Sequence, residues 1–347
     1  MNSRERVMAV FNKQIPDRVP MFNFWMDENV LKKIDANISW PDFCVREDLD
    51  IIVVDMDHDV EVLDENNGIF KNEWGVIRKR ATEKITIPID GPIKTTQDLK
   101  KYTPPDPTDI NRLYSLREIV KNYKSKKIIA MHIHDAFNIP WYLRGGIDRL
   151  LIDYYDNPQL SRDLANISTD YYLEIVKQAL HIGADIFIIG DDYAYKNGPL
   201  MSPKNFEDFI LPGLARIVSE IKENCSYCIK HTDGDITPII DMIISSGIDA
   251  LHHIEPNVGM DIAEIKQKYS DKICVCGNVD VGYILSEATP DEVEFCVKDL
   301  INKVSKNGRH IISDSSSILS TVKPENYIRM IDSIKKFGRY PQFEQKN

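Results

Sequence analysis

The most informative segment of the chain is Cys228-Ile-Lys-His-Thr-Asp-Gly-Asp235. Residues 225–230 have the pattern of a short buried β-strand, and the polar turn that follows carries His231 and Asp233 before an apolar helical run over 239–244. A strand that ends in ligand-capable side chains and passes directly into a helix is typical of the sites of α/β proteins. We therefore predict an α/β protein with functional residues at the ends of its strands.

Other strand candidates end in the same way. Together with residues 225–230 there are eight, and the others are centred near residues 20, 52, 130, 187, 251, 274 and 311, mostly with helices between them. Eight parallel strands with crossover helices favour closure into a (β/α)8 TIM barrel. An open doubly wound sheet is the alternative, although no glycine-rich turn follows the first strand, 19–25.

One segment departs from this alternation. We expect a single barrel domain over residues 1–347 with an N-terminal excursion of antiparallel strands at about 59–107, which begins with a hairpin on Asn67-Gly68. The expected helix signals are an N-cap at Ser3, a capping box at Thr289-Pro-Asp-Glu292, N-caps at Asp235 and Asp261, and a bend at Pro212 in a helix over 203–224.

Composition and charge exclude several classes of function. The chain has 43% hydrophobic and 28% charged residues, as soluble globular proteins do, and no apolar run of the ~18 residues that a membrane span needs. A net charge of −11 argues against nucleic acid or an anionic membrane as partner. The charged N-terminus has no signal-peptide core, so we expect a cytoplasmic protein. The six cysteines do not suggest a disulfide framework. We interpret Cys225, Cys228, Cys274 and Cys276 as small buried hydrophobic residues, with a four-cysteine zinc site as the alternative.

In a barrel, the carboxyl ends of the strands form one rim, where the sites of this fold lie. Any single polar residue there could be a helix cap, but here nearly every strand ends in one. This pattern predicts a functional rim made of Asn23, Trp25, Asp55, Asp57, His134, Asp135, Asp191, Asp192, His231, Asp233, Glu255, Asn278, Asp280, Asp314 and Ser315.

His231, Asp233 and Glu255 suit a metal ion, because one imidazole and two carboxylates are a known zinc ligand set. The alternative is a histidine held by a neighbouring carboxylate without a metal. His252 and His253 alternate faces within one strand candidate, so at least one of them should be structural.

Several short motifs share their order and spacing with one family. The chain resembles the uroporphyrinogen decarboxylase superfamily, on the branch that includes corrinoid-linked methyltransferases. The resemblance covers nearly the whole chain and rests on Arg4-Glu-Arg6 with Pro16-Asp-Arg-Val-Pro20, Gly190-Asp-Asp192 with Gly198-Pro-Leu-Met-Ser-Pro203, His231-Thr-Asp-Gly234, Glu255-Pro256 with Gly259-Met-Asp261, Gly277-Asn-Val-Asp280, and Pro324-Glu-Asn326.

The sequence departs from both branches of this family. The decarboxylases share an arginine-rich N-terminal segment that grips a tetrapyrrole, whereas residues 21–27 contain no arginine. Thiol-methylating members carry His-x-Cys and a late Cys as zinc ligands; here His231 is kept, Asp233 stands in place of the Cys, and 314–317 has no Cys. The resemblance therefore implies an oxygen-rich site, with Glu255 matching a nearby glutamate, that would act on an oxygen or nitrogen centre.

The resemblance implies a methyltransferase that moves a methyl group between a small substrate and a corrinoid, such as methylcobalamin, carried by a separate corrinoid protein. A zinc ion bound by His231, Asp233 and Glu255 would assist this methyl transfer. A decarboxylase of a tetrapyrrole or other acid, with Asp55 or Asp57 stabilising a cation, is the alternative, as is a non-catalytic binder of a small molecule or corrinoid; a homodimer is a further expectation. The expected catalytic residues are Asp192, His134 and Asp55, and the expected substrate-binding residues are Asn23, Trp25, Asp191, Asn278, Asp280 and Ser315.

Overall fold

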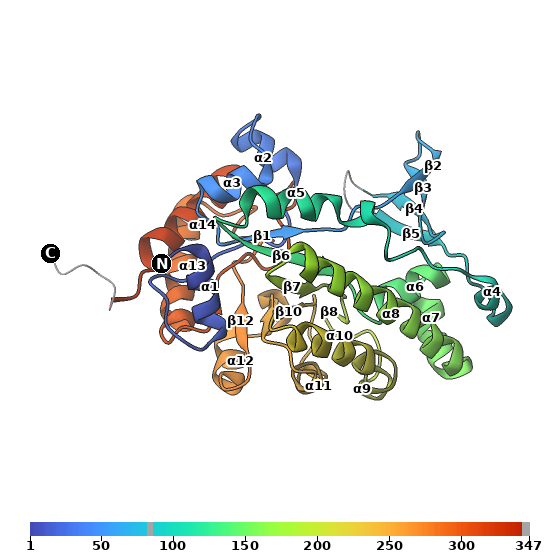
Figure 1. The fold of residues 1–347 in the computed structure, drawn as a ribbon. Helices are drawn as coiled ribbons and strands as arrows, with labels where there is room; N and C mark the ends of the chain where they lie inside the picture. Colours follow the sequence, from blue (N-terminus) through green and yellow to red (C-terminus); the bar gives the residue numbers. More distant parts are fainter. Residues whose placement is uncertain (82–85, 342–347) are drawn as a thin grey trace.

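Seven parallel strands form one curled sheet in the computed structural model, which describes residues 1–81 and 86–341 (Figure 1). Most strands are short runs of β-branched and other apolar residues, and nearly all of these residues are buried, as expected for a sheet covered on both faces. In spatial order the strands are β1 (Ile51–Val54), β6 (Ile128–Ile133), β7 (Ile186–Ile189), β10 (Tyr227–His231), β11 (Ala250–His252), β12 (Cys274–Cys276) and β13 (His310–Ile311). The predicted α/β barrel architecture is confirmed, with one exception.

The exception is the first expected strand, 19–25, which is not a regular strand. It is an extended segment that makes isolated parallel bridges, such as Met21 with Ile312. The Phe22 amide donates to the Ile312 carbonyl (3.2 Å), and the Asp50 amide donates to the Met21 carbonyl (2.7 Å). The segment therefore lies between β13 and β1 in the eighth position of the barrel. Pro20 has no amide hydrogen, which removes one donor from a regular ladder.

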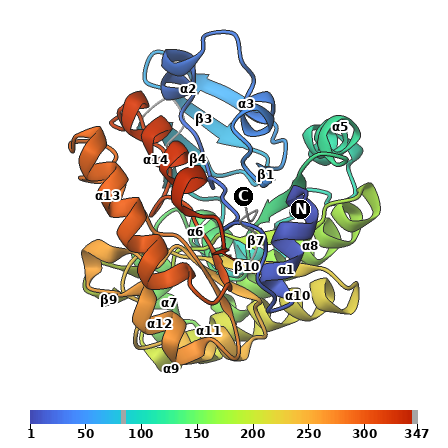
Figure 2. The ribbon, with the colours of Figure 1, turned by 90° about the vertical axis from the view of Figure 1, so that its left-hand side faces the viewer.

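Helices surround the sheet, and Figure 2 shows α8, α10, α11, α12, α13 and α14 around its outside. The helices are α1 (Ser3–Phe11), α2 (Glu28–Ile34), α3 (Trp40–Arg46), α4 (Thr96–Lys101), α5 (Tyr114–Tyr123), α6 (Asn138–Arg144), α7 (Ile147–Asp156), α8 (Pro158–Ile182), α9 (Pro203–Asn205), α10 (Leu211–Glu223), α11 (Ile240–Ser245), α12 (Ile262–Tyr269), α13 (Pro290–Leu300) and α14 (Pro324–Phe337). Short 3₁₀ turns span Ile110–Leu113 and Pro256–Val258, and π-turns span Phe206–Ile210 and Ile301–Ser305. Over the described part of the chain, no helix is long and apolar enough to cross a membrane.

The predicted helix signals have mixed outcomes. The capping box that begins at Thr289 and the N-cap at Asp261 are confirmed. The N-cap of α1 is Asn2 rather than Ser3, because the Asn2 side chain accepts from the Glu5 amide. Asp235 accepts from the Thr237 amide in a turn, and α11 starts only at Ile240, so the predicted helix cap there is wrong. The irregularity expected at Pro212 lies just before it: a π-turn spans Phe206–Ile210, and Pro212 is in the first turn of α10.

The predicted antiparallel excursion is confirmed as a four-stranded sheet of β2 (Val60–Asp64), β3 (Ile69–Asn72), β4 (Ile77–Arg80) and β5 (Thr86–Asp90), in that order. Gly68 has a φ of +63°, which suits glycine in the hairpin turn between β2 and β3. Figure 1 shows this sheet beside α6, at one end of the barrel. A small pair, β8 (Ala194–Tyr195) and β9 (Gly198–Pro199), follows β7.

The opposite end of the barrel is filled by α1. Val7, Val10 and Phe11 pack in one cluster with inward residues of the strands, and Phe11 stacks on Tyr227 with ring centroids 4.7 Å apart. Apolar packing thus closes this end of the barrel. The polar carboxyl ends of the strands lie at the other end, where a site can form.

Buried His310 on β13 predicts acid sensitivity. Its Nε2 lies 2.6 Å from the Gly277 carbonyl, to which it donates, and its Nδ1 accepts from the Ser305 hydroxyl (2.8 Å). Burial lowers the pKa of His310 to about 3. Below pH ~6.5 the unfolded chain takes up a proton that the folded chain refuses, so the stability present at neutral pH falls by about 1.4 kcal/mol per pH unit until the folded pKa is reached. Urea unfolding between pH 7 and 4.5 should show this loss of stability. In His310→Gln the free energy of unfolding should fall less steeply with decreasing pH, by about 1.4 kcal/mol per pH unit, because unfolding takes up one proton fewer. An equal dependence on pH in the variant and the wild type would contradict the prediction.

Candidate functional site

His231, at the end of β10, faces two carboxylates. Its Nε2 lies 3.6 Å from Asp233 Oδ1 and 3.7 Å from Asp192 Oδ1. One ligand-capable atom from each of the three residues falls within 4.8 Å of those of the other two. The turn that carries Asp233 is tied to the end of β7, because the Asp233 amide donates to Asp192 Oδ1 (3.0 Å). Two neighbouring strands of the sheet thus bring these residues together, as the rim prediction requires.

A chain of hydrogen bonds fixes which nitrogen of His231 carries the proton. The Ser313 hydroxyl donates to the Asp314 carbonyl (2.9 Å), so its oxygen accepts from His252 Nε2 (3.0 Å). Burial lowers the pKa values of His252 and His231 well below their usual range, so both rings are neutral. His252 Nδ1 must then accept from His231 Nδ1 (2.8 Å), which leaves His231 Nε2 as a bare lone pair.

This lone pair points at two carboxylate oxygens, which is unfavourable unless a cation or a proton lies between them. Burial, together with the charges of Asp192 and Glu255, raises the pKa of Asp233 to about 8. Asp233 Oδ1 is buried without a hydrogen-bond partner among the described residues. One imidazole nitrogen and two carboxylate oxygens fit a divalent metal such as zinc, so the donor set suits a metal site.

Glu255 does not join this triad. Its Oε2 accepts from the Gly234 amide (3.1 Å). Among the described residues, potential metal ligands gather in two groups, the triad and His231 with His252 and His253, and Glu255 belongs to neither. Asp192, predicted as catalytic, takes the position that the sequence analysis assigned to Glu255.

Both His252 and His253 lie beside His231, with ring centroids 5.0 and 5.1 Å from it. His252 is structural, as expected for at least one of the two, because both of its ring nitrogens are hydrogen bonded. His253 Nε2 is 3.4 Å from Asp233 Oδ1, and both of its nitrogens lack a hydrogen-bond partner in the part of the chain that the structure describes. His253 was not predicted as a site residue, because the sequence analysis treated His252 and His253 as alternating residues of one strand. In the structure β11 ends at His252, so this alternation does not apply to His253.

A second buried network starts from Asp191. Its Oδ1 accepts from His134 Nδ1 (2.6 Å), and its Oδ2 accepts from the amides of Phe137 (3.0 Å) and Asn138 (2.9 Å). Burial alone would raise the pKa of Asp191, but His134 and the nearby hydrogen bonds hold it well below its usual range. Asp191 therefore orients His134 instead of facing a ligand, and the neutral His134 presents Nε2 outward.

Asp135, also predicted at the rim, is fully buried next to Asp191. Burial and the charge of Asp191 raise the pKa of Asp135 well above its usual range. It contacts the Tyr193 hydroxyl, and Lys230 Nζ lies 3.4 Å from its Oδ2. These buried contacts of Asp135 therefore help to hold the strand ends at the rim in place.

A row of rings crosses the barrel mouth and links the two regions. Phe24 stacks on His231 with centroids 4.4 Å apart and meets His132 at 5.0 Å, and His132 lies 5.1 Å from His134. Asp55 Oδ1 is 2.6 Å from His132 Nδ1. Asp55, predicted as catalytic, is thus paired with His132, which the sequence analysis did not single out.

The remaining predicted residues have mainly internal partners. Asn23 donates to Asp314 Oδ2 (2.5 Å) and accepts from the Tyr327 hydroxyl (2.6 Å), and all three are buried. Asn278 donates to the Ile254 carbonyl (2.6 Å), and Asp57 accepts from the Ser115 amide (2.8 Å).

Asp280 accepts from the amides of Gly282 (3.1 Å) and Tyr283 (2.8 Å) in its own turn, and the Ser315 hydroxyl accepts from the Val281 amide (3.1 Å). Trp25 lines a pocket of about 380 Å³ with Asp55 and Phe24, the ring that stacks on His231. Of the predicted substrate-binding residues, Asn23, Asn278, Asp280 and Ser315 thus have hydrogen-bond partners within the protein.

The cysteines form neither a disulfide nor a metal cluster over the described part of the chain. Cys228, Cys274 and Cys276 are buried as predicted, whereas Cys225 is exposed. The alternative of a four-cysteine zinc site therefore has no support in the geometry.

Three comparisons place this architecture among known proteins. The family model described as uroporphyrinogen decarboxylase (URO-D) matches residues 79–337. A uroporphyrinogen decarboxylase from Vesicomyosocius okutanii is 23% identical over 264 residues, covering 72% of this chain and 71% of that protein, and one from Trichodesmium erythraeum is 23% identical over 250 residues, covering 69% and 67%.

Among solved structures, a methyltransferase from Methanosarcina mazei has the same fold, with a TM-score of 0.76 and 16% identity over 97% of this chain and 99% of that one. The family match extends over most of the barrel, from β4 to the end of α14. The chain therefore belongs to the uroporphyrinogen decarboxylase family.

Proposed function

We propose that this protein is a zinc-assisted methyltransferase that moves a methyl group between a small substrate and a corrinoid carried by a partner protein. The observation that carries the proposal is the lone pair of His231 Nε2, which lies 3.6 and 3.7 Å from two carboxylate oxygens. In the metal-free site a proton on Asp233, whose pKa is raised to about 8, would relieve this contact, and a bound metal ion would displace that proton.

In this proposal His231, Asp192 and Asp233 hold the metal, and the hydrogen bonds from His231 through His252 to Ser313 keep the ligating nitrogen deprotonated. The metal would polarise the methyl-bearing or methyl-accepting atom of the substrate. His134 would accept or return a proton at Nε2, because Asp191 fixes the proton on Nδ1. Phe24 and the adjoining rings would exclude water from the mouth.

The fold likeness to the Methanosarcina mazei protein supports the proposal only at the level of architecture. The names of the curated relatives favour a second candidate, decarboxylation, in which Asp55 would stabilise a developing cation. We rank it second because residues 21–27 offer no arginine, and because a substrate with eight carboxylates would meet a protein of charge −11.

Zinc content and methylcobalamin turnover test the proposal together. Purified protein should contain about one zinc per chain by plasma mass spectrometry, and it should change the cobalt absorption spectrum of methylcobalamin when a methyl acceptor is added. A metal-free protein that releases CO₂ from uroporphyrinogen would reject methyl transfer in favour of the second candidate.

A further inference from the structure

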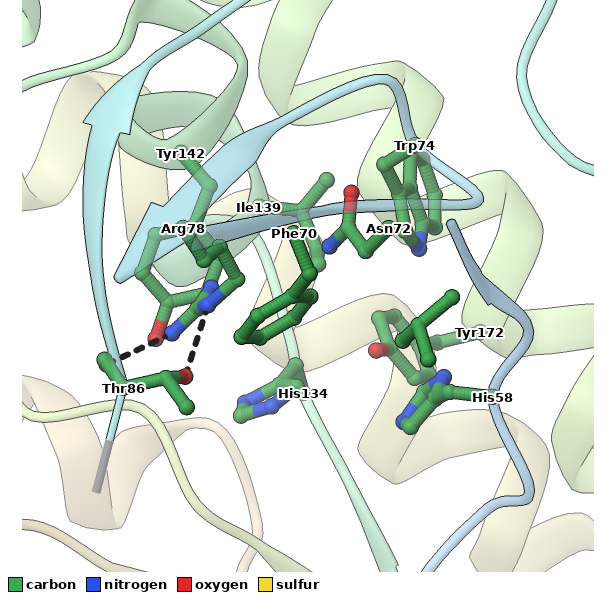
Figure 3. Close-up of a pocket in the computed structure, with 11 residues that line it drawn as sticks. His58, Phe70, Asn72, Trp74, Arg78, Thr86, His134, Ile139, Tyr142 and Tyr172 are labelled. Atoms are coloured by element: carbon green, nitrogen blue, oxygen red, sulfur yellow. Dashed lines mark hydrogen bonds between the residues drawn. The ribbon is translucent and has the colours of Figure 1, made fainter. Parts of the chain in front are cut away.

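A cavity of about 290 Å³ lies where the β2–β5 sheet faces helices α6 and α8, above His134 (Figure 3). Its walls include four aromatic rings, those of Phe70, Trp74, Tyr142 and Tyr172. Flat aromatic surfaces around a space of this size favour a small, flat ligand. The cavity is separate from the His231 triad and is joined to it by the row of rings at the barrel mouth.

Among the described residues that line the cavity, Arg78 carries the one permanent charge, since none of them is a lysine, an aspartate or a glutamate. Its Nε and Nη2 donate to the hydroxyl (2.8 Å) and the carbonyl (2.9 Å) of Thr86. Its guanidinium also lies 4.4 Å from the centre of the Tyr142 ring. A cation held in this way is suited to a carboxylate, because little side-chain freedom is lost on binding.

Tyr172 gives the cavity a polar group. The residue as a whole is only 1% exposed, and it lines the cavity. Figure 3 shows this hydroxyl directed toward the middle of the cavity, near His134. A hydroxyl that faces the cavity can donate to or accept from a polar group of a ligand.

His134 complements Tyr172. Its Nδ1 donates to Asp191, so its Nε2 is an acceptor, and the two rings are 5.7 Å apart. A ligand hydroxyl could accept from Tyr172 and donate to His134 at the same time.

We propose that this cavity binds a small aromatic hydroxy acid, with its carboxylate on Arg78 and its hydroxyl between Tyr172 and His134. The aromatic body of the ligand lies among the four rings. The proposal concerns binding alone, so it depends neither on a metal at His231 nor on methyl transfer.

Isothermal titration calorimetry of the full chain with 4-hydroxybenzoate tests the site. The acid should bind at least about tenfold more tightly than its neutral analogue 4-hydroxybenzyl alcohol, and Arg78→Gln should abolish this preference. Tyr172→Phe should lower the affinity for 4-hydroxybenzoate by about fivefold and leave the affinity for benzoate unchanged, because only 4-hydroxybenzoate carries the hydroxyl group.

Lys79→Gln is the matched control. Lys79 is the next residue of β4, its side chain faces the other side of the sheet, and it does not line the cavity. The affinity of the Lys79→Gln variant for 4-hydroxybenzoate should equal that of the wild type. No binding to the wild type, no preference for the acid, or an equal loss in Lys79→Gln would overturn the proposal. Intact binding in a protein without methyltransferase activity would reject the proposed function and leave this site in place.

Discussion

His231→Ala should contain less than about a tenth of the wild-type zinc and should transfer methyl groups at least about a thousandfold more slowly. The reason is that His231 contributes the only nitrogen of the triad, and its Nε2 is held free of a proton by His252. Metal content by plasma mass spectrometry and the rate of methylcobalamin consumption measure the two effects. Thermal unfolding of the variant checks that the barrel still folds.

Two comparisons make this result specific. His181→Ala removes an exposed histidine in the last turn of α8 and should change neither zinc nor rate. Asp192→Asn should lose zinc, whereas Glu255→Gln should keep it, because Glu255 binds the Gly234 amide instead of facing His231. Zinc and turnover that survive in His231→Ala would refute the ligand assignment, and loss of zinc in Glu255→Gln alone would restore the ligand set expected from the sequence.

The convergence of strand ends could be predicted from sequence because it follows from topology. In a parallel barrel all strands end at the same rim, so His231 and a carboxylate from a neighbouring strand had to lie close together. Which carboxylate reaches His231 depends on the path of the turns. Asp192 follows β7 and Glu255 follows β11, and both strands flank β10. The Asp233 amide binds Asp192 and the Gly234 amide binds Glu255, and no sequence pattern encodes these two bonds.

The aromatic cavity could not be predicted for a different reason. Its residues come from the excursion and the residues just before it, from the end of β6, from α6 and from α8, and α6 was not among the elements that the sequence pattern predicted. Arg78 looks like an ordinary charged residue on an exposed hairpin, and Tyr172 looks like part of the apolar face of α8. Their common function becomes visible only when the β2–β5 sheet covers the end of β6, as Figure 3 shows.

The irregular segment 19–25 raises the question of what holds it in the eighth position of the barrel. Asp50, just before β1, is fully buried and accepts from Arg6 Nη1 (2.6 Å) and Arg18 Nη1 (2.8 Å). Its Oδ2 also accepts from the Met21 amide (2.9 Å). One carboxylate thus fastens α1, the segment and β1 together. Two arginines that were quoted for the family resemblance therefore have a structural role here, which motif matching could not distinguish from a role in binding.

Asp50→Ala should therefore reduce the free energy of unfolding by about 3–5 kcal/mol, because it leaves two buried guanidinium groups without their shared carboxylate. Urea unfolding at neutral pH measures this loss. Asp170→Ala is the control: Asp170 also pairs with an arginine, Arg216 (2.7 Å), but the two side chains are 64% and 47% exposed, so its loss should be below about 1 kcal/mol. Equal losses in the two variants would show that the buried carboxylate does not hold the barrel closed. A large loss confined to Asp50→Ala would mean that ionic contacts at Asp50 replace the regular strand pairing that segment 19–25 lacks.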